Sequence, residues 1–237
     1  MMKADKYSPV GFFDSGVGGI TVLDEAMRLL PRENYLYLAD CSHAPYGSRP
    51  RGEILDRARF CVQTLADAGA KAAVIACNTA TAVAIETLRQ EFDMPVIGAE
   101  PAIKPACDVC GDRPVLVLVT PLTAAEPRLM RLIARFPDKN ILVAPLDGLA
   151  AAVEKHIDAL YALRTDVYRR LSAYPEPGAV VLGCTHYVHI KTLISDYYGG
   201  RVPVVDGNRG IALRLKAELT SAGMLNDSGG HVRFVSV

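Results

Sequence analysis

The chain has 237 residues, of which 50% are hydrophobic and 22% are charged, and its 26 basic and 26 acidic side chains give a formal net charge of +0. This balance gives no sign of the basic surface that is typical of nucleic-acid-binding proteins. No apolar run approaches the roughly 18 residues of a membrane span. The first eight residues carry two lysines and an aspartate in place of the apolar core of a signal peptide. We therefore expect a cytoplasmic globular protein without nucleic-acid or membrane partners, whose six cysteines are mostly reduced.

Apolar, strand-like runs alternate with helix-like segments along the chain. The first half predicts strands at 10–13, 35–39, 72–76 and 95–98, with helices at 20–30, 51–68 and 80–92. The second half predicts strands at 114–119, 140–146, 180–183 and 203–205, with helices at 127–136, 149–174, 187–198 and 211–222. Strands that alternate with helices favour parallel sheets, so the expected fold class is α/β.

The spacing of the predicted strand ends repeats between the two halves. Asp40 lies 37 residues before Cys77, and Asp147 lies 37 residues before Cys184. A fixed spacing between similar units indicates an internal repeat. We therefore predict a pseudo-twofold pair of similar lobes, each with a parallel sheet flanked by helices, and an active site in the cleft between them.

Two of the predicted strands end at a cysteine that is followed by small polar residues. Cys77 closes the first of these runs, and Cys184 closes the second. Ligands bind at the carboxyl ends of strands in open α/β sheets, so both thiols are expected at the cleft. A single cysteine at such a place is more often a small buried side chain than a catalyst. The repeat favours a functional pair.

Two opposed thiols suit a particular reaction. One thiolate can remove a proton from one face of a bound molecule while the other thiol returns a proton to the opposite face, which inverts a carbon centre by general acid–base catalysis. Asp14 and His186 are candidates to manage the protons of the thiols. Backbone N–H groups at the predicted helix starts can hold a carboxylate, together with the side chains of Ser15, Asn78, Thr79 and Thr185.

Four ordered motifs resemble the glutamate racemases of the aspartate/glutamate racemase superfamily. They are Phe13–Gly19, Pro45–Gly47, Ala76–Thr79 and Leu182–His186, and the likeness extends from about Val10 to Leu219. The resemblance implies a racemase without a cofactor that interconverts L- and D-glutamate and supplies D-glutamate for peptidoglycan synthesis. It also implies a homodimer, and a first lobe of residues 1–98 plus 208–237 with a second lobe of residues 99–207.

The resemblance also implies roles for individual residues. Cys77 would act on the α-proton of D-glutamate with help from Asp14, and Cys184 on that of L-glutamate with help from His186. The substrate site would be lined by Asp14, Ser15, Pro45, Tyr46, Gly47, Asn78, Thr79, Thr120, Thr123, Thr185 and His186. The family usually has a glutamate beside the second cysteine, and the match in this chain is Asp147, a possible assisting acid that is one methylene shorter.

Other functions stay open at this point. The chain can be a racemase of aspartate or a related amino acid, although aspartate racemases tend to have an acid where His186 follows Cys184 and Thr185. A decarboxylase of the same superfamily typically keeps only one of the two thiols. A two-lobed sensor that closes on an amino acid would need the pocket but not both cysteines.

Three further motifs weakly suggest a nucleotide or a metal. Gly16–Gly19 lacks the full spacing of a dinucleotide-binding loop. Cys107 and Cys110 have no second pair at zinc spacing, so they are expected to be structural thiols. His186 and His189 lack a neighbouring carboxylate in the sequence to complete a ligand set. We therefore expect no metal site.

Overall fold

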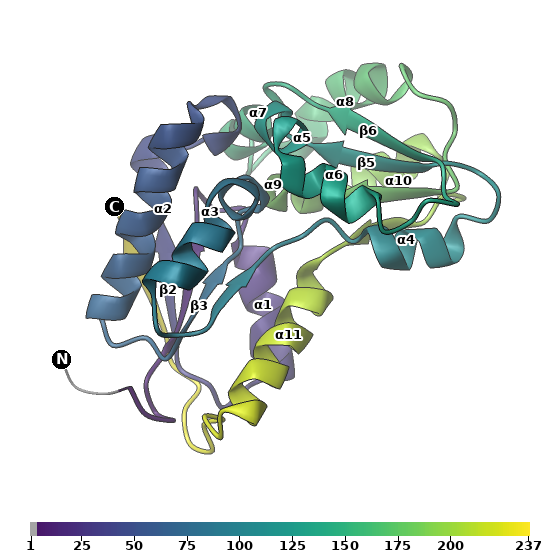
Figure 1. The fold of residues 1–237 in the computed structure, drawn as a ribbon. Helices are drawn as coiled ribbons and strands as arrows, with labels where there is room; N and C mark the ends of the chain where they lie inside the picture. Colours follow the sequence, from purple (N-terminus) through teal and green to yellow (C-terminus); the bar gives the residue numbers. More distant parts are fainter. Residues whose placement is uncertain (1–3) are drawn as a thin grey trace.

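The computed structural model describes residues 4–237 and shows two parallel sheets with helices packed on them (Figure 1). The expected α/β fold class is confirmed. The first sheet has the strand order β4-β3-β1-β2-β9, and the second has the order β6-β5-β7-β8. We call each sheet with the helices that cover it a lobe, and we name the lobes first and second after their sheets.

The first lobe is built from both ends of the chain. Its strands are β1 Val10–Asp14, β2 Tyr35–Ala39, β3 Ala72–Ile75, β4 Val96–Gly98 and β9 Val232–Ser236. Its helices are α1 Ile20–Leu29, α2 Arg51–Asp67, α3 Asn78–Glu91 and α11 Asn208–Ser221, with the 3-10 turns η1 Cys41–His43 and η2 Tyr46–Ser48. Helices α1 and α11, which are far apart in the sequence, pack side by side in Figure 1.

Each face of the first sheet has its own core because side chains alternate along a strand. Phe13 and Ile75 pack with the apolar sides of α2 and α3. Phe12 and Val74, on the opposite face, pack with α1 and α11. Strands buried on both faces read as continuous apolar runs, which is why the sequence predicted them well.

The second lobe repeats this plan with one strand fewer. Its strands are β5 Val115–Val119, β6 Ile141–Pro145, β7 Ala179–Leu182 and β8 Val204–Asp206. Its helices are α4 Ile103–Val109, α5 Pro121–Ala125, α6 Pro127–Ile133, α7 Leu149–Lys155, α8 Arg164–Leu171, α9 Thr185–His189 and α10 Lys191–Tyr197, with the 3-10 turn η3 Leu160–Leu163. Read from β8, the order β8-β7-β5-β6 matches β4-β3-β1-β2, which supports the internal repeat.

The structure corrects two expected helices and adds a strand that was not expected. The helix expected at 149–174 is wrong as one element, because the chain leaves α7 at His156 and inserts η3, which buries Leu163, before α8 begins. The helix expected at 187–198 is two short helices that meet at Ile190. Strand β9 was not expected, since it is an edge strand whose side chains are largely outside the core. The lobe bounds of 1–98 plus 208–237 and 99–207 stay a prediction.

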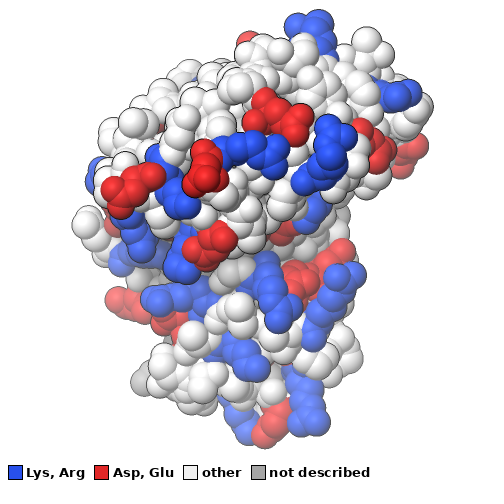
Figure 2. Space-filling model, turned by 90° about the vertical axis from the view of Figure 1, so that its right-hand side faces the viewer, with Lys and Arg blue, Asp and Glu red and all other residues white. Residues whose placement is uncertain are grey.

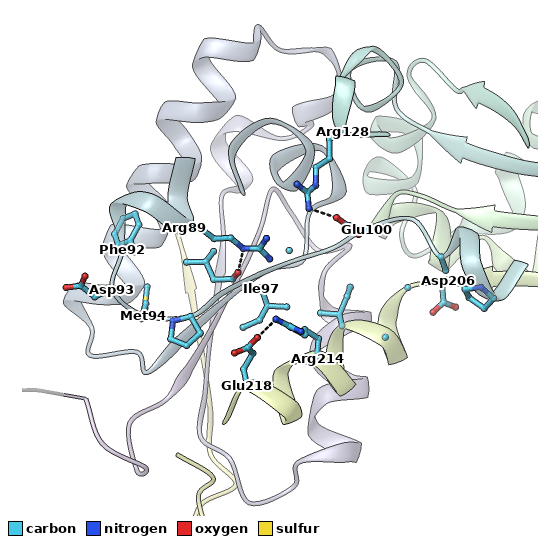
Figure 3. A pocket seen from close by; sticks show the side chains of 18 residues that line it. Arg89, Phe92, Asp93, Met94, Ile97, Glu100, Arg128, Asp206, Arg214 and Glu218 are labelled. Atoms are coloured by element: carbon cyan, nitrogen blue, oxygen red, sulfur yellow. Dashed lines mark hydrogen bonds and ion pairs between the residues drawn. The ribbon is translucent and has the colours of Figure 1, made fainter. Parts of the chain in front are cut away.

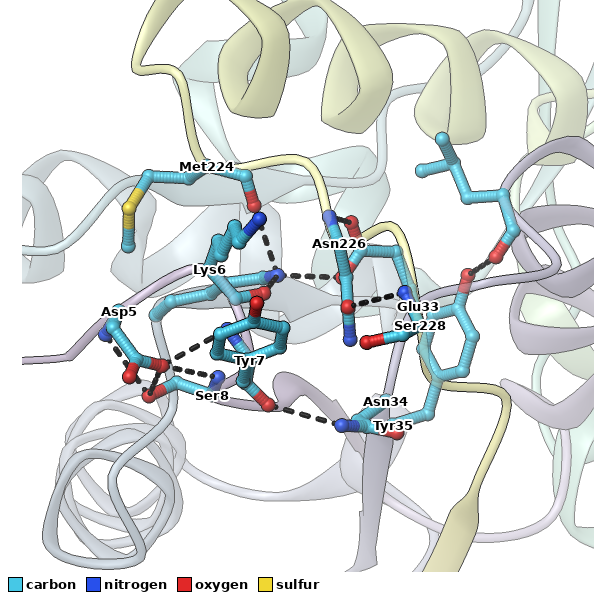
Figure 4. Close-up of polar contacts among 12 residues, drawn as sticks. Asp5, Lys6, Tyr7, Ser8, Glu33, Asn34, Tyr35, Met224, Asn226 and Ser228 are labelled. Carbon is cyan, nitrogen blue, oxygen red and sulfur yellow. Dashed lines mark hydrogen bonds and ion pairs between the residues drawn. The ribbon is translucent and has the colours of Figure 1, made fainter.

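A buried ion pair ties both chain ends to the first sheet (Figure 4). Lys71 Nζ lies 2.5 Å from Glu33 Oε2 and also donates to the carbonyl oxygens of Lys6 and Met224, at 2.6 and 2.9 Å. The other oxygen of Glu33 accepts a hydrogen bond from the backbone N–H of Asn226 at 2.8 Å. This cluster lies where the strands begin, so it anchors the segment before β9 at the end of the sheet opposite to the cysteines.

Charges of both signs share the face of the molecule that Figure 2 presents. Figure 2 shows basic and acidic side chains mixed over one face of the molecule, without a large patch of a single sign. Within residues 4–237, no helix is both long enough and apolar enough to cross a membrane.

Candidate active site

The carboxyl ends of the central strands carry the predicted site residues. Asp14 ends β1, and Cys77 and Cys184 each follow the end of a strand, β3 and β7 respectively, after one intervening residue. The parallel register aligns Phe13 with Ile75, so Asp14 and Cys77 leave the sheet at the same edge. The two lobes meet there, because the hydroxyl of Thr185 donates to Asp14 Oδ2 across the lobes at 3.0 Å.

Cys77 lies in a buried acidic setting. Its sulfur is 3.7 Å from Ser15 Oγ and accepts a hydrogen bond from the N–H of Ala80, at 3.5 Å, as the N-cap of α3. Ser15 Oγ is in turn 3.2 Å from Asp14 Oδ1. Burial, and then the charge of Asp14, raise the pKa of the Cys77 thiol far above its usual value. Burial also raises the pKa of Asp14, which is fully enclosed. The surroundings of Cys77 therefore keep its proton on the sulfur.

Cys184 lies beside a histidine. His186 Nδ1 is 3.9 Å from the Cys184 sulfur, and His186 Nε2 pairs with the carboxylate of Glu154. Burial alone would lower the pKa of His186, but its contacts with Cys184 and Glu154 outweigh burial and hold that pKa well above 6.5. The same pairing outweighs burial at Glu154 and lowers its pKa. The imidazole is therefore held in its charged form next to the second sulfur.

Glu154 occupies the place that the resemblance gave to Asp147. Asp147 is exposed just beyond β6, and its backbone carbonyl accepts a hydrogen bond from Arg170. Glu154 comes seven residues later in α7, where its carboxylate reaches His186 and lies 3.4 Å from the N–H of Val17 in the first lobe. The sequence does contain a signal, because Glu154 is the one acid in the otherwise apolar start of that helix, Leu149–Glu154.

A second buried carboxylate supports the Pro45–Gly47 loop. Asp40 is completely enclosed and accepts hydrogen bonds from the Tyr46 hydroxyl at 2.6 Å and from two nitrogens of Arg57 at 2.9 and 2.8 Å. These bonds, with the contact to His43, outweigh the effect of burial and lower the pKa of Asp40. The loop approaches the second lobe closely, since a Cβ on Gly47 would lie 2.9 Å from Thr120.

Three buried threonine hydroxyls join the lobes next to this loop. Thr79 Oγ1 lies 2.9 Å from Thr120 Oγ1 and 3.2 Å from Thr123 Oγ1, and the last two are 2.9 Å apart. Thr79 belongs to α3 in the first lobe, whereas the other two flank the start of α5 in the second. The neighbouring Asn78 donates from its side chain to the carbonyl of Ala99 at 3.3 Å. These hydroxyls can exchange their mutual bonds for bonds to a carboxylate.

The structure thus gathers nearly all of the expected site residues around the contact between the lobes. The lobes are closed there, and a small hollow lined by Asn78, Cys184 and Thr185, among others, lies beside the second sulfur. A larger groove of about 740 Å³ lies elsewhere, along β4 and α11, where Arg89, Arg128 and Arg214 face Glu100 and Glu218 (Figure 3). That groove contains neither cysteine of the pair.

Cys107 and Cys110 lie outside this site. Both are buried at the end of α4, and the Cys110 sulfur contacts the carbonyl of Cys107 at 3.5 Å and Lys139 Nζ at 3.9 Å. In the part of the chain that the structure describes, no group of three or more histidine, cysteine, aspartate or glutamate side chains has the arrangement of a metal site.

Known proteins match the chain over most of its length. Residues 21–214 match the family described as Asp/Glu/Hydantoin racemase. A glutamate racemase from Clostridium novyi is 41% identical over 231 residues, which are 95% of this chain and 89% of that protein. The crystal structure of glutamate racemase isoform RacE1 from Bacillus anthracis has a TM-score of 0.89 at 29% identity and covers 98% of this chain and 89% of that chain.

A further solved structure is that of the Escherichia coli glutamate racemase in complex with L-glutamate and the activator UDP-MurNAc-ala. It has a TM-score of 0.86 at 30% identity and covers 97% of this chain and 88% of that chain. The resemblance deduced from four short motifs is thereby confirmed along the chain. The family match, the full-length relative and the shared two-sheet fold agree, and the chain belongs to the Asp/Glu/Hydantoin racemase family.

Proposed function

We propose that this chain is a glutamate racemase that inverts the α-carbon with two cysteine thiols and no cofactor. The observation that carries the proposal is the pairing of Cys77 and Cys184 at equivalent strand ends of two similar lobes, each thiol with its own proton-managing neighbour. The curated relative at 41% identity supports glutamate as the substrate.

In the direction from L- to D-glutamate, the Cys184 thiolate removes the α-proton. The electron pair of the broken Cα–H bond moves into the α-carboxylate, and the carbon becomes planar. The Cys77 thiol then donates its proton to the opposite face, which leaves Cys77 as thiolate and Cys184 as thiol. The reverse reaction exchanges these roles. Charged His186 stabilises the Cys184 thiolate, and Asp14 favours the protonated form of Cys77.

The remaining side chains hold and enclose the substrate. Ser15, Asn78 and the hydroxyls of Thr79, Thr120, Thr123 and Thr185 can bind the two carboxylates of glutamate together with backbone N–H groups at the helix starts. Tyr46 and Gly47 close the site from the loop that Asp40 supports. Separation of the lobes admits the substrate, and their closure excludes water.

Racemisation of aspartate is the main alternative, and a sensor or a one-thiol decarboxylase is a more distant one. Two buried, differently assisted thiols favour a reaction that needs a base on each face, which neither a sensor nor a one-thiol enzyme requires.

Circular dichroism of L-glutamate and L-aspartate, incubated separately with pure protein and no added cofactor, tests the proposal. The glutamate signal should decay to zero while the aspartate signal persists. Decay of the aspartate signal alone would reassign the substrate. Binding of glutamate without exchange of its α-hydrogen in deuterated water would identify a sensor.

The proposal extends to the setting of the reaction. We propose a cytoplasmic homodimer whose D-glutamate supplies peptidoglycan synthesis, as the family resemblance implies. Sedimentation of the pure protein tests the dimer. Growth of a bacterial strain that requires D-glutamate, after expression of this chain, tests the supply, and a Cys77→Ser/Cys184→Ser variant is the matched control.

A further inference from the structure

A buried tyrosine next to the site has no part in the mechanism proposed above. Tyr37 lies in the middle of β2 with 2% of its surface exposed, and its hydroxyl donates to the carbonyl oxygen of Gly16 at 2.9 Å. The acceptor lies in the turn Ser15–Gly19, which links β1 to α1 and carries Ser15, whose hydroxyl is 3.7 Å from the Cys77 sulfur. Tyr37 is therefore bonded to the backbone of the site itself.

The bonded carbonyl belongs to the peptide group between Gly16 and Val17, whose other end faces the second lobe. The N–H of this peptide, on Val17, lies 3.4 Å from both carboxylate oxygens of Glu154. Glu154 in turn pairs with His186, which contacts the sulfur of Cys184. A continuous chain of contacts thus runs from Tyr37, through one peptide plane, to the assistant of the second cysteine.

The turn does not fix the orientation of this peptide by itself. Gly16 has no side chain to restrict its backbone, and a Cβ there would lie 2.6 Å from Glu154 Oε1, so a larger residue would displace that carboxylate. The restraint therefore has to come from outside the turn. The Tyr37 hydroxyl supplies it at the carbonyl of Gly16. Asp14 Oδ1 accepts the N–H of Gly16 at 3.3 Å, but this bond holds the preceding peptide, between Ser15 and Gly16.

We propose that Tyr37 is a positioning residue, which holds the peptide between Gly16 and Val17 so that its N–H keeps Glu154 against His186. This assignment rests on the proposed function for its kinetic consequences, but not for the structural contact. Burial, followed by the charges of Asp14 and Glu154, raises the pKa of Tyr37 well above 10. The hydroxyl consequently stays a donor at every pH at which the protein works.

Strand β2 offers a matched control. Tyr35 is as buried as Tyr37, and its hydroxyl also donates to backbone carbonyls, those of Ala26 and Leu30 at 3.1 and 2.8 Å. Those carbonyls are at the end of α1, beside the Glu33 cluster in Figure 4 and away from the thiols. Tyr35→Phe therefore removes a similar buried hydrogen bond without touching the site.

The kinetic test is a double-mutant cycle with Tyr37→Phe and Glu154→Gln. Loss of one buried hydrogen bond should lower kcat/KM for glutamate about tenfold in Tyr37→Phe. The same substitution in the Glu154→Gln background should lower kcat/KM less than about twofold, because Tyr37 and Glu154 act through one contact. Tyr35→Phe should leave kcat/KM unchanged. An equal loss in both backgrounds, or an equal loss in Tyr35→Phe, would overturn the assignment.

A second measurement does not depend on turnover. Amide hydrogen exchange of the Val17 N–H should become faster in Tyr37→Phe and stay unchanged in Tyr35→Phe. Unchanged exchange in both variants would reject the positioning role. If the wild-type protein racemises neither glutamate nor aspartate, the proposed function fails, and the exchange result still decides whether Tyr37 holds this peptide.

Discussion

The two lobes share a strand order but treat their cysteines differently. In the first lobe, Cys77 caps the long helix α3 and lies near Asp14, which disfavours its thiolate. In the second lobe, Cys184 precedes the five-residue helix α9 and makes no capping bond, and its sulfur faces His186 instead. The same architecture therefore places an acid beside one sulfur and a cation beside the other.

This difference matches what the proposed mechanism needs when it starts from L-glutamate. One sulfur must begin as a proton donor and the other as a proton acceptor, and two identical sites would begin with the same protonation state. Each lobe also contacts the acid that lies near the cysteine of the other lobe. Thr185 of the second lobe donates a hydrogen bond to Asp14, and the Val17 N–H of the first lobe faces Glu154. Closure of the lobes therefore completes both proton-managing sites at once.

The largest expected effect comes from removing either sulfur. Cys77→Ser and Cys184→Ser should each lower kcat for racemisation by about 10³-fold or more, because a serine hydroxyl is a far weaker acid than a thiol and does not ionise to supply a base near neutral pH. Polarimetric rates with each enantiomer measure this. Cys107→Ser, at another buried cysteine, should stay near the wild-type rate. Near wild-type turnover of either site variant would disprove the two-thiol mechanism.

The substitution Glu154→Gln tests the proton-managing group beside the cysteine of the second lobe. We expect kcat to fall about 10- to 100-fold, because the charged form of His186 loses its partner. Glu154 raises the pKa of His186, so its replacement lowers that pKa, and the alkaline limb of the pH–rate profile should move to lower pH.

The pH dependence of kcat/KM between pH 6 and 10 checks this shift. Asp147→Asn is the matched control and should leave the profile unchanged, since Asp147 is exposed. A larger effect at Asp147 than at Glu154 would restore the assignment that the spacing of the sequence suggested.

Gly47→Ala probes how closely the lobes must approach, and the expected effect is smaller. The added Cβ would meet Thr120 at 2.9 Å, so the loop must shift and KM for glutamate should rise about tenfold with a smaller change in kcat. Gly52→Ala, where nothing lies within 4 Å, should leave KM unchanged and stabilise α2 by up to about 1 kcal/mol. Equal KM values in the two variants would show that the loop has room to spare.

Much of the fold was readable from the sequence because the strands are buried on both faces. The runs before Cys77 and Cys184 are apolar throughout, and the equal spacing from Asp40 and Asp147 revealed the repeat. Strand β9 was not predicted because it lies at an edge of the sheet and its apolar pattern is weak. Its pairing with β2 stabilises it more than the burial of its side chains does.

The sequence did not show which acid contacts His186. It aligned Asp147 with Asp40, and both do follow equivalent strands, but only the structure shows that a carboxylate two helical turns later reaches His186. Tyr37 was hidden for a related reason. Within a buried apolar run, a tyrosine reads as one more core side chain, and nothing in the sequence reveals which carbonyl its hydroxyl meets.

The sequence by itself determined where strands β1 to β8 lie, which of them are followed by a cysteine, and that the plan occurs twice. These features are local, since they depend on the burial pattern and on the residue at each strand end. The tertiary structure decided which acid serves which sulfur and how the lobes complete each other's sites. Those contacts join residues up to 171 positions apart, as between Asp14 and Thr185, and no local pattern encodes a distance across a fold.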